Sequence, residues 1–223
     1  GERSGPMTRT LRIEWHPGRK VTARLAVPRR PAGAAVLLAH GAGAGQSHPF
    51  LSGLRSRLAA AGHPTLTFDY PYVEESRKAP DRAPRLLACH RAALCRLQGY
   101  GWPVVLAGKS MGGRMASHLA VEEKSPIGLV FYGYPLVSPS SGAVRPTGHL
   151  AETGMRMLFL SGSRDRLAPL DELRPVVRSV RGATLEVVEG ADHSFKVPKR
   201  IGTTEEEVLD RLAEATVRWI RNP

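Results

Sequence analysis

The sequence has no apolar run long enough to cross a bilayer, which takes about 20 residues. Its longest such run, Ala34–Ala39, has the length of a β-strand. It also has no basic stretch followed by an apolar segment of about 7–15 residues, so we expect no signal peptide and a cytoplasmic location. Residues 1–6 show no structural pattern and precede Met7 directly. We expect them to be a cloning remnant, followed by a single domain over residues 7–223.

Cysteine is scarce, with 2 in 223 residues, which is too few for a disulfide scaffold. Cys89 and Cys95 lie six apart on a predicted helix and so do not face each other. We predict both to be small buried residues of a reduced protein. The 8 histidines are scattered, with no H-E-x-x-H and no C-x-x-C pattern. We therefore expect no metal site and no cofactor.

Negative charge is in deficit: 32 Lys and Arg against 20 Asp and Glu give a net charge of +12. Most of these cations are arginines spread along the chain, which is also rich in Ala, Gly and Pro, a combination typical of GC-rich coding. The basic clusters are no longer than pairs such as Arg29-Arg30, and no RNA- or DNA-binding motif is present. Nucleic acid is therefore not the expected partner, although the charge could still attract anionic substrates.

Apolar strand-like runs alternate with helix-like segments along the chain. Strands are predicted at 11–15, 21–27, 34–39, 65–68, 104–107, 127–131, 157–160 and 184–188. Helices are predicted at 50–61, 84–98, 111–122, 171–179 and 204–220. This order predicts an α/β fold with a mostly parallel central sheet, helices on both faces and an antiparallel hairpin at one edge. In such sheets ligands bind at the carboxyl ends of the strands.

One motif stands where a strand is predicted to turn into a helix. Gly108-Lys109-Ser110-Met111-Gly112 has the form G-x-S-x-G, which places a serine on a sharp strand-to-helix turn. The flanking glycines leave room for that turn, and the backbone N–H of Met111 points to where an oxyanion would form. Two rival motifs are excluded. A P-loop requires glycine at position 103, where this chain has proline, and a dinucleotide-binding fingerprint requires glycine at position 46, where it has glutamine.

An acid and a histidine should follow later strands in the order Ser, Asp, His. Asp165 comes five residues after the predicted strand 157–160, and His193 five after 184–188. We predict that His193 accepts the Ser110 proton and that Asp165 orients the imidazole. Asp171 and Asp192 are the alternative carboxylates. The first should cap a helix, and the second adjoins His193 too closely to face its ring.

The sequence His40-Gly41-Ala42-Gly43 follows the strand 34–39. We assign a second oxyanion N–H to Ala42, with Gly41 or Gly43 as alternatives, and a loop-orienting role to His40. Substrate contacts are predicted, on weaker grounds, at Tyr134 and His149, and Tyr70, Tyr72 and Tyr132 are further candidates at strand ends. The proline-broken segment 133–153 should cover the site only in part, which leaves a shallow pocket for small or flexible acyl groups.

Taken together, these residues resemble the α/β-hydrolase superfamily, and within it the dienelactone-hydrolase-like branch and the KANL/Tex type of hydrolase-like domain. The likeness rests on the segments 40–45, 108–114, 133–136 and 190–195 and covers nearly the whole chain from Leu11. It implies the α/β-hydrolase fold with no large cap domain, and esterase-like activity. Dienelactone hydrolases use a cysteine nucleophile where this chain has Ser110, so dienelactone cleavage is not expected.

The sequence thus predicts a serine hydrolase that cleaves a small ester or thioester through an acyl-Ser110 intermediate. Two alternatives stay open. An alcohol or amine could intercept the acyl-enzyme, which would make the protein an acyltransferase, or the domain could be a non-catalytic scaffold or binding module.

Overall fold

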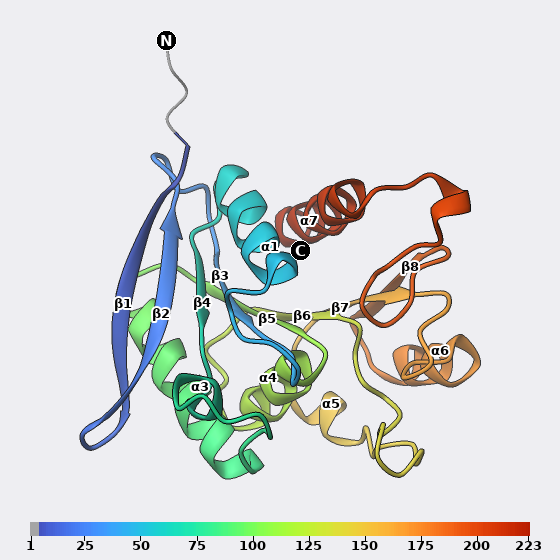
Figure 1. Ribbon diagram of the computed structural model, residues 1–223, viewed down its shortest axis with the longest axis horizontal. Helices are drawn as coiled ribbons and strands as arrows, with labels where there is room; N and C mark the ends of the chain where they lie inside the picture. Colours follow the sequence, from blue (N-terminus) through green and yellow to red (C-terminus); the bar gives the residue numbers. More distant parts are fainter. Residues whose placement is uncertain (1–4) are drawn as a thin grey trace.

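The computed structural model describes residues 5–223, so residues 1–4 of the predicted cloning remnant lie outside the described part. One sheet of eight strands runs through the molecule in the order β1-β2-β4-β3-β5-β6-β7-β8 (Figure 1). The strands are β1 (Met7–His16), β2 (Arg19–Val27), β3 (Ala35–Ala39), β4 (Thr65–Phe68), β5 (Val104–Lys109), β6 (Gly128–Tyr132), β7 (Met157–Gly162) and β8 (Ala183–Val188). The helices are α1 (Pro49–Ala60), α2 (Pro71–Glu74), α3 (Ala83–Gln98), α4 (Met111–Glu122), α5 (His149–Glu152), α6 (Leu170–Ser179) and α7 (Glu205–Arg221), with a 3₁₀ turn at Lys199–Ile201.

Pairing within the sheet is mixed in the way the sequence predicts. The hairpin β1–β2 is antiparallel and joins β4 in antiparallel register. Every pair from β4 across to β8 is parallel. The predicted fold class is confirmed: a mostly parallel sheet, a hairpin at one edge and no large cap domain.

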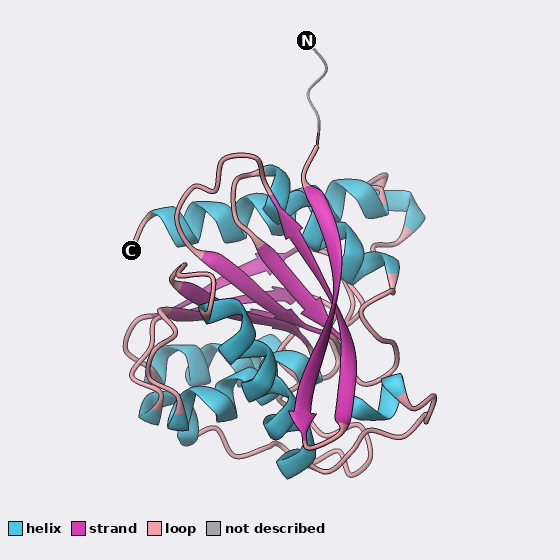
Figure 2. Ribbon diagram, turned by 90° about the vertical axis from the view of Figure 1, so that its left-hand side faces the viewer, coloured by secondary structure: helices cyan, strands magenta, loops and turns pink. Residues whose placement is uncertain are grey.

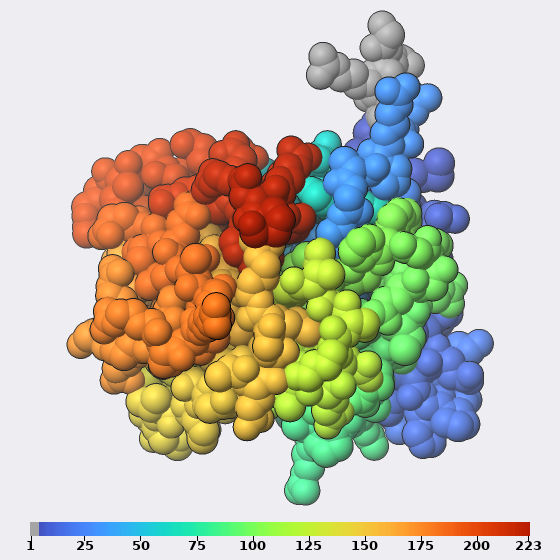
Figure 3. All heavy atoms as spheres, turned by 180° about the vertical axis from the view of Figure 1, so that it is seen from behind, coloured from blue at the N-terminus to red at the C-terminus, as the bar shows by residue number. Residues whose placement is uncertain are grey.

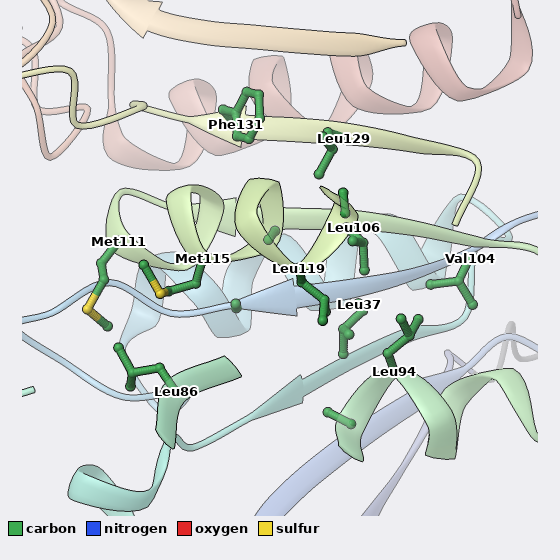
Figure 4. Close-up of a cluster of buried hydrophobic side chains, with 14 of the residues drawn as sticks. Leu37, Leu86, Leu94, Val104, Leu106, Met111, Met115, Leu119, Leu129 and Phe131 are labelled. Atoms are coloured by element: carbon green, nitrogen blue, oxygen red, sulfur yellow. The ribbon is translucent and has the colours of Figure 1, made fainter. Parts of the chain in front are cut away.

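Helices cover both faces of the sheet (Figure 2), because the central strands are apolar on both sides. Successive side chains of a strand point to opposite faces. Leu37 and Leu106 therefore pack in the cluster beneath α3 and α4, part of which Figure 4 shows, whereas Leu38 packs with α1 and α7 on the other face. Seen from behind, the blue N-terminal hairpin and the orange and red C-terminal segments lie at opposite sides of the molecule (Figure 3).

The strand order places a topological switch at β3. The chain leaves β3 toward β4 on one side and later returns to add β5 on the other. Loops that follow two such strands diverge in opposite directions and leave a crevice between them, which is where ligands bind in open α/β sheets. The loop after β3 starts at His40, and the loop after β5 contains Ser110.

The structure corrects several local predictions. The short helices α2 and α5 were not predicted, since a four-residue helix has too few residues for a periodic pattern. Helix α6 starts at Leu170 after Pro169, so Asp171 lies in its first turn and is not the N-cap. Cys89 is buried as predicted, whereas Cys95 is exposed, because it lies on the outer side of α3. In residues 5–223, no helix combines the length and apolarity needed for a membrane span.

Candidate functional site

The turn from β5 into α4 holds Ser110 in an uncommon backbone conformation. Its φ is 49° and its ψ is −117°, a left-handed region that strains any residue with a side chain. The two neighbouring glycines are required by packing. A Cβ on Gly108 would lie 2.2 Å from the backbone nitrogen of Gly113, and one on Gly112 would lie 2.5 Å from the carbonyl oxygen of Ala39. The G-x-S-x-G spacing therefore reflects backbone contacts within the turn and between the start of α4 and the end of β3.

Ser110, His193 and Asp165 form a continuous hydrogen-bonded chain. Ser110 Oγ lies 2.8 Å from His193 Nε2, and His193 Nδ1 lies 2.8 Å from Asp165 Oδ2. Because a carboxylate only accepts hydrogen bonds, Nδ1 donates to Asp165, which leaves Nε2 of a neutral imidazole free to accept from the Ser110 hydroxyl. In this tautomer an imidazole can remove a proton from a serine that attacks a carbonyl group.

Burial and a backbone hydrogen bond hold Asp165 in place. The Asp165 carboxylate is fully buried, and its second oxygen accepts the backbone N–H of Leu167 at 2.8 Å. The alternative Asp192 turns away from the imidazole, since its Oδ1 accepts the backbone N–H groups of Ser194 and Lys196, both at 2.9 Å. Asp165 is thus the carboxylate that the structure brings to His193.

The loop after β3 lies against the serine turn. His40 donates from Nδ1 to the Gly41 carbonyl at 2.7 Å and accepts the Tyr70 backbone N–H on Nε2 at 3.0 Å, so it holds the loop in a neutral form. Burial lowers the pKa of His40, in keeping with that tautomer. Tyr72 donates its hydroxyl to the carbonyl of Ala42 at 3.0 Å. Sequence reasoning did not assign this bracing role to Tyr72, because nothing local marks it.

Two backbone N–H groups near Ser110 are free to donate a hydrogen bond to a ligand oxygen. Met111 is the first residue of α4, and the first N–H groups of a helix have no partner within it. Within residues 5–223, the N–H of Ala42 has no backbone partner either. Both residues line one cavity with Ser110, so the structure brings together the two donors that the sequence suggests.

Lys109 is a site residue whose role the sequence left open. Its Nζ donates to the carbonyl oxygen of His193 at 2.7 Å and lies 5.9 Å from the ring centre of Phe50 and 5.7 Å from that of Phe195. Burial lowers the pKa of Lys109 to about 8, although Asp165 and Asp192 act in the opposite direction. The Lys109 side chain thus links the loop that contains His193 to the turn that contains Ser110.

Two cavities meet at Ser110. The first, which we call the histidine pocket, has a volume of about 500 Å³ and contains His193 and Lys109 in its wall. The second, which we call the arginine pocket, has a volume of about 240 Å³. The arginine pocket is lined by Ala42, Pro80, Asp81, Ala83, Leu86, Ser110, Met111, Arg114, Met115, Pro135, Pro139, Arg145 and Leu167. Pro139 and Arg145 belong to the segment 133–153, which therefore forms part of the wall.

Two predicted substrate contacts are not at either pocket. Tyr134 is 1% exposed and packs edge-on against Phe131 in the core, with a ring-centre distance of 5.1 Å. His149 stacks on His118 at 3.9 Å and lies 2.8 Å from Ser117 Oγ. The position of a residue after a strand predicts the sheet edge but not the direction of its side chain. The same holds for the other aromatic candidates, Tyr70, Tyr72 and Tyr132, which are all buried.

In the part of the chain that the structure describes, no cluster of three or more His, Cys, Asp or Glu side chains is arranged to bind a metal ion.

Comparison with known proteins relates this arrangement to a family. A model described as an alpha/beta hydrolase domain matches residues 32–221. A dienelactone hydrolase from Anabaena variabilis is 22% identical with a TM-score of 0.79, and the match covers 98% of each chain. An alpha-beta serine hydrolase homologue from Coxiella burnetii is 19% identical with a TM-score of 0.71, covering 94% of this chain and 96% of that one. An α/β serine hydrolase without a lid from Xanthomonas campestris is 16% identical with a TM-score of 0.72, covering 95% and 94%. At these identities the structural likeness is one of fold.

Proposed function

The chain belongs to the α/β-hydrolase domain family. We propose that it is a member of the dienelactone-hydrolase-like branch and a serine hydrolase that cleaves a small ester or thioester. The observation behind this proposal is the hydrogen-bonded chain from Ser110 through His193 to Asp165, with both distances at 2.8 Å. Hydrolase chemistry is also what the descriptions of the structural relatives support.

The first half of the reaction forms an acyl-enzyme. Ser110 Oγ attacks the carbonyl carbon of the substrate while His193 Nε2 takes its proton, and Asp165 stabilises the resulting imidazolium. The negative charge that develops on the carbonyl oxygen is stabilised by the N–H groups of Met111 and Ala42. When the tetrahedral intermediate collapses, the bond to the leaving oxygen or sulfur breaks and His193 returns the proton to it.

The second half repeats these steps with water. His193 removes a proton from a water molecule, the hydroxide attacks the acyl carbon, and Ser110 leaves with its proton restored. If an alcohol or amine replaced water at this step, the same residues would perform acyl transfer, so the product formed in the presence of an added alcohol separates the two reactions.

An active-site label tests the proposal directly. A fluorophosphonate probe reacts only with a serine that a neighbouring base activates, and intact mass reports the number of adducts. We expect one adduct on the wild type and none on Ser110→Ala, because the variant lacks the nucleophile. His193→Ala should lose about 10⁴-fold or more in labelling rate, since the members of such a chain act as a unit.

The matched control is Ser140→Ala, which removes an exposed serine from the segment 133–153. This variant should label like the wild type. A folded wild type without an adduct would refute the proposal and favour a non-catalytic scaffold, and an adduct that persists on Ser110→Ala would refute the assignment of the nucleophile.

A further inference from the structure

We propose that the acyl group of the substrate carries a negative charge, most simply a carboxylate, which Arg114 and Arg145 bind in the arginine pocket. This inference rests on the proposed function, because it names the substrate class for the reaction at Ser110. Neither arginine belongs to the serine, histidine and acid chain, and neither was singled out by the sequence.

The two guanidinium groups reach the pocket from different parts of the chain. Arg114 lies on α4, about one turn after Ser110, and Arg145 lies in the segment between β6 and α5. The Nε atoms of both are buried without a hydrogen-bond partner. In the part of the structure that spans residues 5–223, neither side chain forms an ion pair or a hydrogen bond.

The buried Nε–H of each arginine lacks an acceptor, which is costly to the protein alone. Buried donors without acceptors lose the hydrogen bonds that water would give them. Burial lowers the pKa of Arg114, and the like charge of Arg145 lowers it further. A carboxylate in the pocket would supply acceptors for the planar N–H groups and cancel the repulsion.

One carboxylate, Asp81, also lines the pocket but is already engaged. It accepts Arg77 at 2.8 Å and the backbone N–H of Tyr72 at 2.8 Å, and Arg85 lies 3.6 Å away. Two arginines outside the pocket thus balance its charge, and Arg114 and Arg145 keep theirs. The pocket therefore has a net positive character.

The position of His193 decides which part of the substrate faces the arginines. His193 must reach the leaving oxygen or sulfur to protonate it, and it lines the histidine pocket. It does not line the arginine pocket, so the acyl group is the part that extends there. Met111, Met115 and Leu86, which lie together at one end of the core cluster in Figure 4, provide apolar contacts for a short methylene chain before its charged end.

Paired esters test the charge preference. The mono-para-nitrophenyl ester of adipic acid and para-nitrophenyl hexanoate have acyl chains of equal length and the same leaving group, but only the first ends in a carboxylate. We expect wild-type kcat/KM to favour the adipate ester by about 10- to 100-fold, the effect of a hydrogen bond between charged groups. Rates on Ser110→Ala give the uncatalysed background.

Substitutions locate the preference in the pocket. Arg114→Gln and Arg145→Gln should each lower the ratio of the two kcat/KM values by about tenfold. Arg114→Lys should keep part of the preference, because it retains the charge but not the planar fork. The matched control is Arg178→Gln, which removes one exposed cation from α6 and should leave the ratio unchanged.

Failure of the inference is distinguishable from failure of the proposed function. If both esters are hydrolysed but the wild-type ratio is one or less, the anionic acyl group is refuted and Ser110 chemistry stands. If Arg178→Gln lowered the ratio of the two kcat/KM values as much as Arg114→Gln does, the preference would come from the overall positive charge of the protein, and binding in the arginine pocket would be refuted. The acetate ester of para-hydroxybenzoate carries its charge on the leaving group, and a preference for it over phenyl acetate that Arg114→Gln abolishes would overturn the acyl placement. A wild type that neither hydrolyses an ester nor takes up the fluorophosphonate overturns both.

Discussion

Replacing Lys109 with methionine should abolish one component of the pH dependence of stability. The Lys109 ammonium is partly buried between the rings of Phe50 and Phe195 and donates to the His193 carbonyl. Burial lowers its pKa from the ordinary 10.5 to about 8. Methionine has a similar length and no charge, so Lys109→Met removes the titrating group and keeps most of the packing.

The sign follows from proton binding. At a pH between the two pKa values the unfolded chain holds the Lys109 proton and the folded protein has lost it. The free energy of unfolding therefore rises with pH in this window and is level below it. The pKa difference corresponds to about 3 kcal/mol in full, of which about 1 kcal/mol falls between about pH 7 and pH 9.

Urea unfolding of wild type and Lys109→Met at these two pH values measures this component. The quantity to compare is the change in the free energy of unfolding from the lower to the higher pH. It should be larger by about 1 kcal/mol in the wild type. The contributions of titrating groups that both proteins share cancel in this comparison. Lys199→Met is the control that shows the effect of removing an exposed lysine. Equal pH dependence in wild type and Lys109→Met would refute the claim that burial shifts this ammonium.

Two further variants probe the serine turn and the loop beside it. Ser110→Gly should be more stable to urea than Ser110→Ala by about 1 kcal/mol. Glycine accepts the positive φ at this position, whereas the same φ strains alanine by about 1–3 kcal/mol. Equal stabilities of the two variants would show that the turn is not strained. Tyr72→Phe removes the hydroxyl that braces the Ala42 carbonyl, so kcat on para-nitrophenyl hexanoate should fall by about tenfold, with KM little changed and a loss of stability of about 1 kcal/mol. The exposed Tyr100→Phe serves as its control, and an unchanged kcat in Tyr72→Phe would exclude a positioning role for the hydroxyl.

The sequence was most informative where function depends on local backbone geometry. The turn at Ser110 is defined within a few residues, because a strand, two space-making glycines and a helix start follow one another in the chain. Asp165 and His193 could be proposed because parallel strands end at a common edge of the sheet. A residue a few positions after the end of such a strand is therefore expected near that edge. Most predicted strands and helices agree with the structure to within one or two residues for the same reason, since their apolar periodicity is local.

Other features depend on contacts between segments that no local pattern links. The hydrogen bond from Lys109 to the His193 carbonyl and the arrangement of Arg114 beside Arg145 join residues that are far apart in the chain or on different elements. Tyr134 was placed at the correct edge but turns inward, because its ring fills space against Phe131. Side-chain direction in irregular segments is set by the core it covers, which the sequence does not show.

The place of β3 in the sheet explains why the site is assembled here. Because β3 and β5 are neighbours in space but separated by β4 in the chain, the loop after β3 and the turn at Ser110 meet, and Gly112 lies against the Ala39 carbonyl. This contact, together with the Tyr72 hydroxyl on the Ala42 carbonyl, holds the N–H of Ala42 relative to that of Met111. The arginine pocket and the histidine pocket both have Ala42 and Ser110 in their walls. A charge at the far end of an acyl chain can therefore be selected without any change to the residues that act on the carbonyl group, since Arg145 comes from a loop segment that contributes no residue to the chain of Ser110, His193 and Asp165.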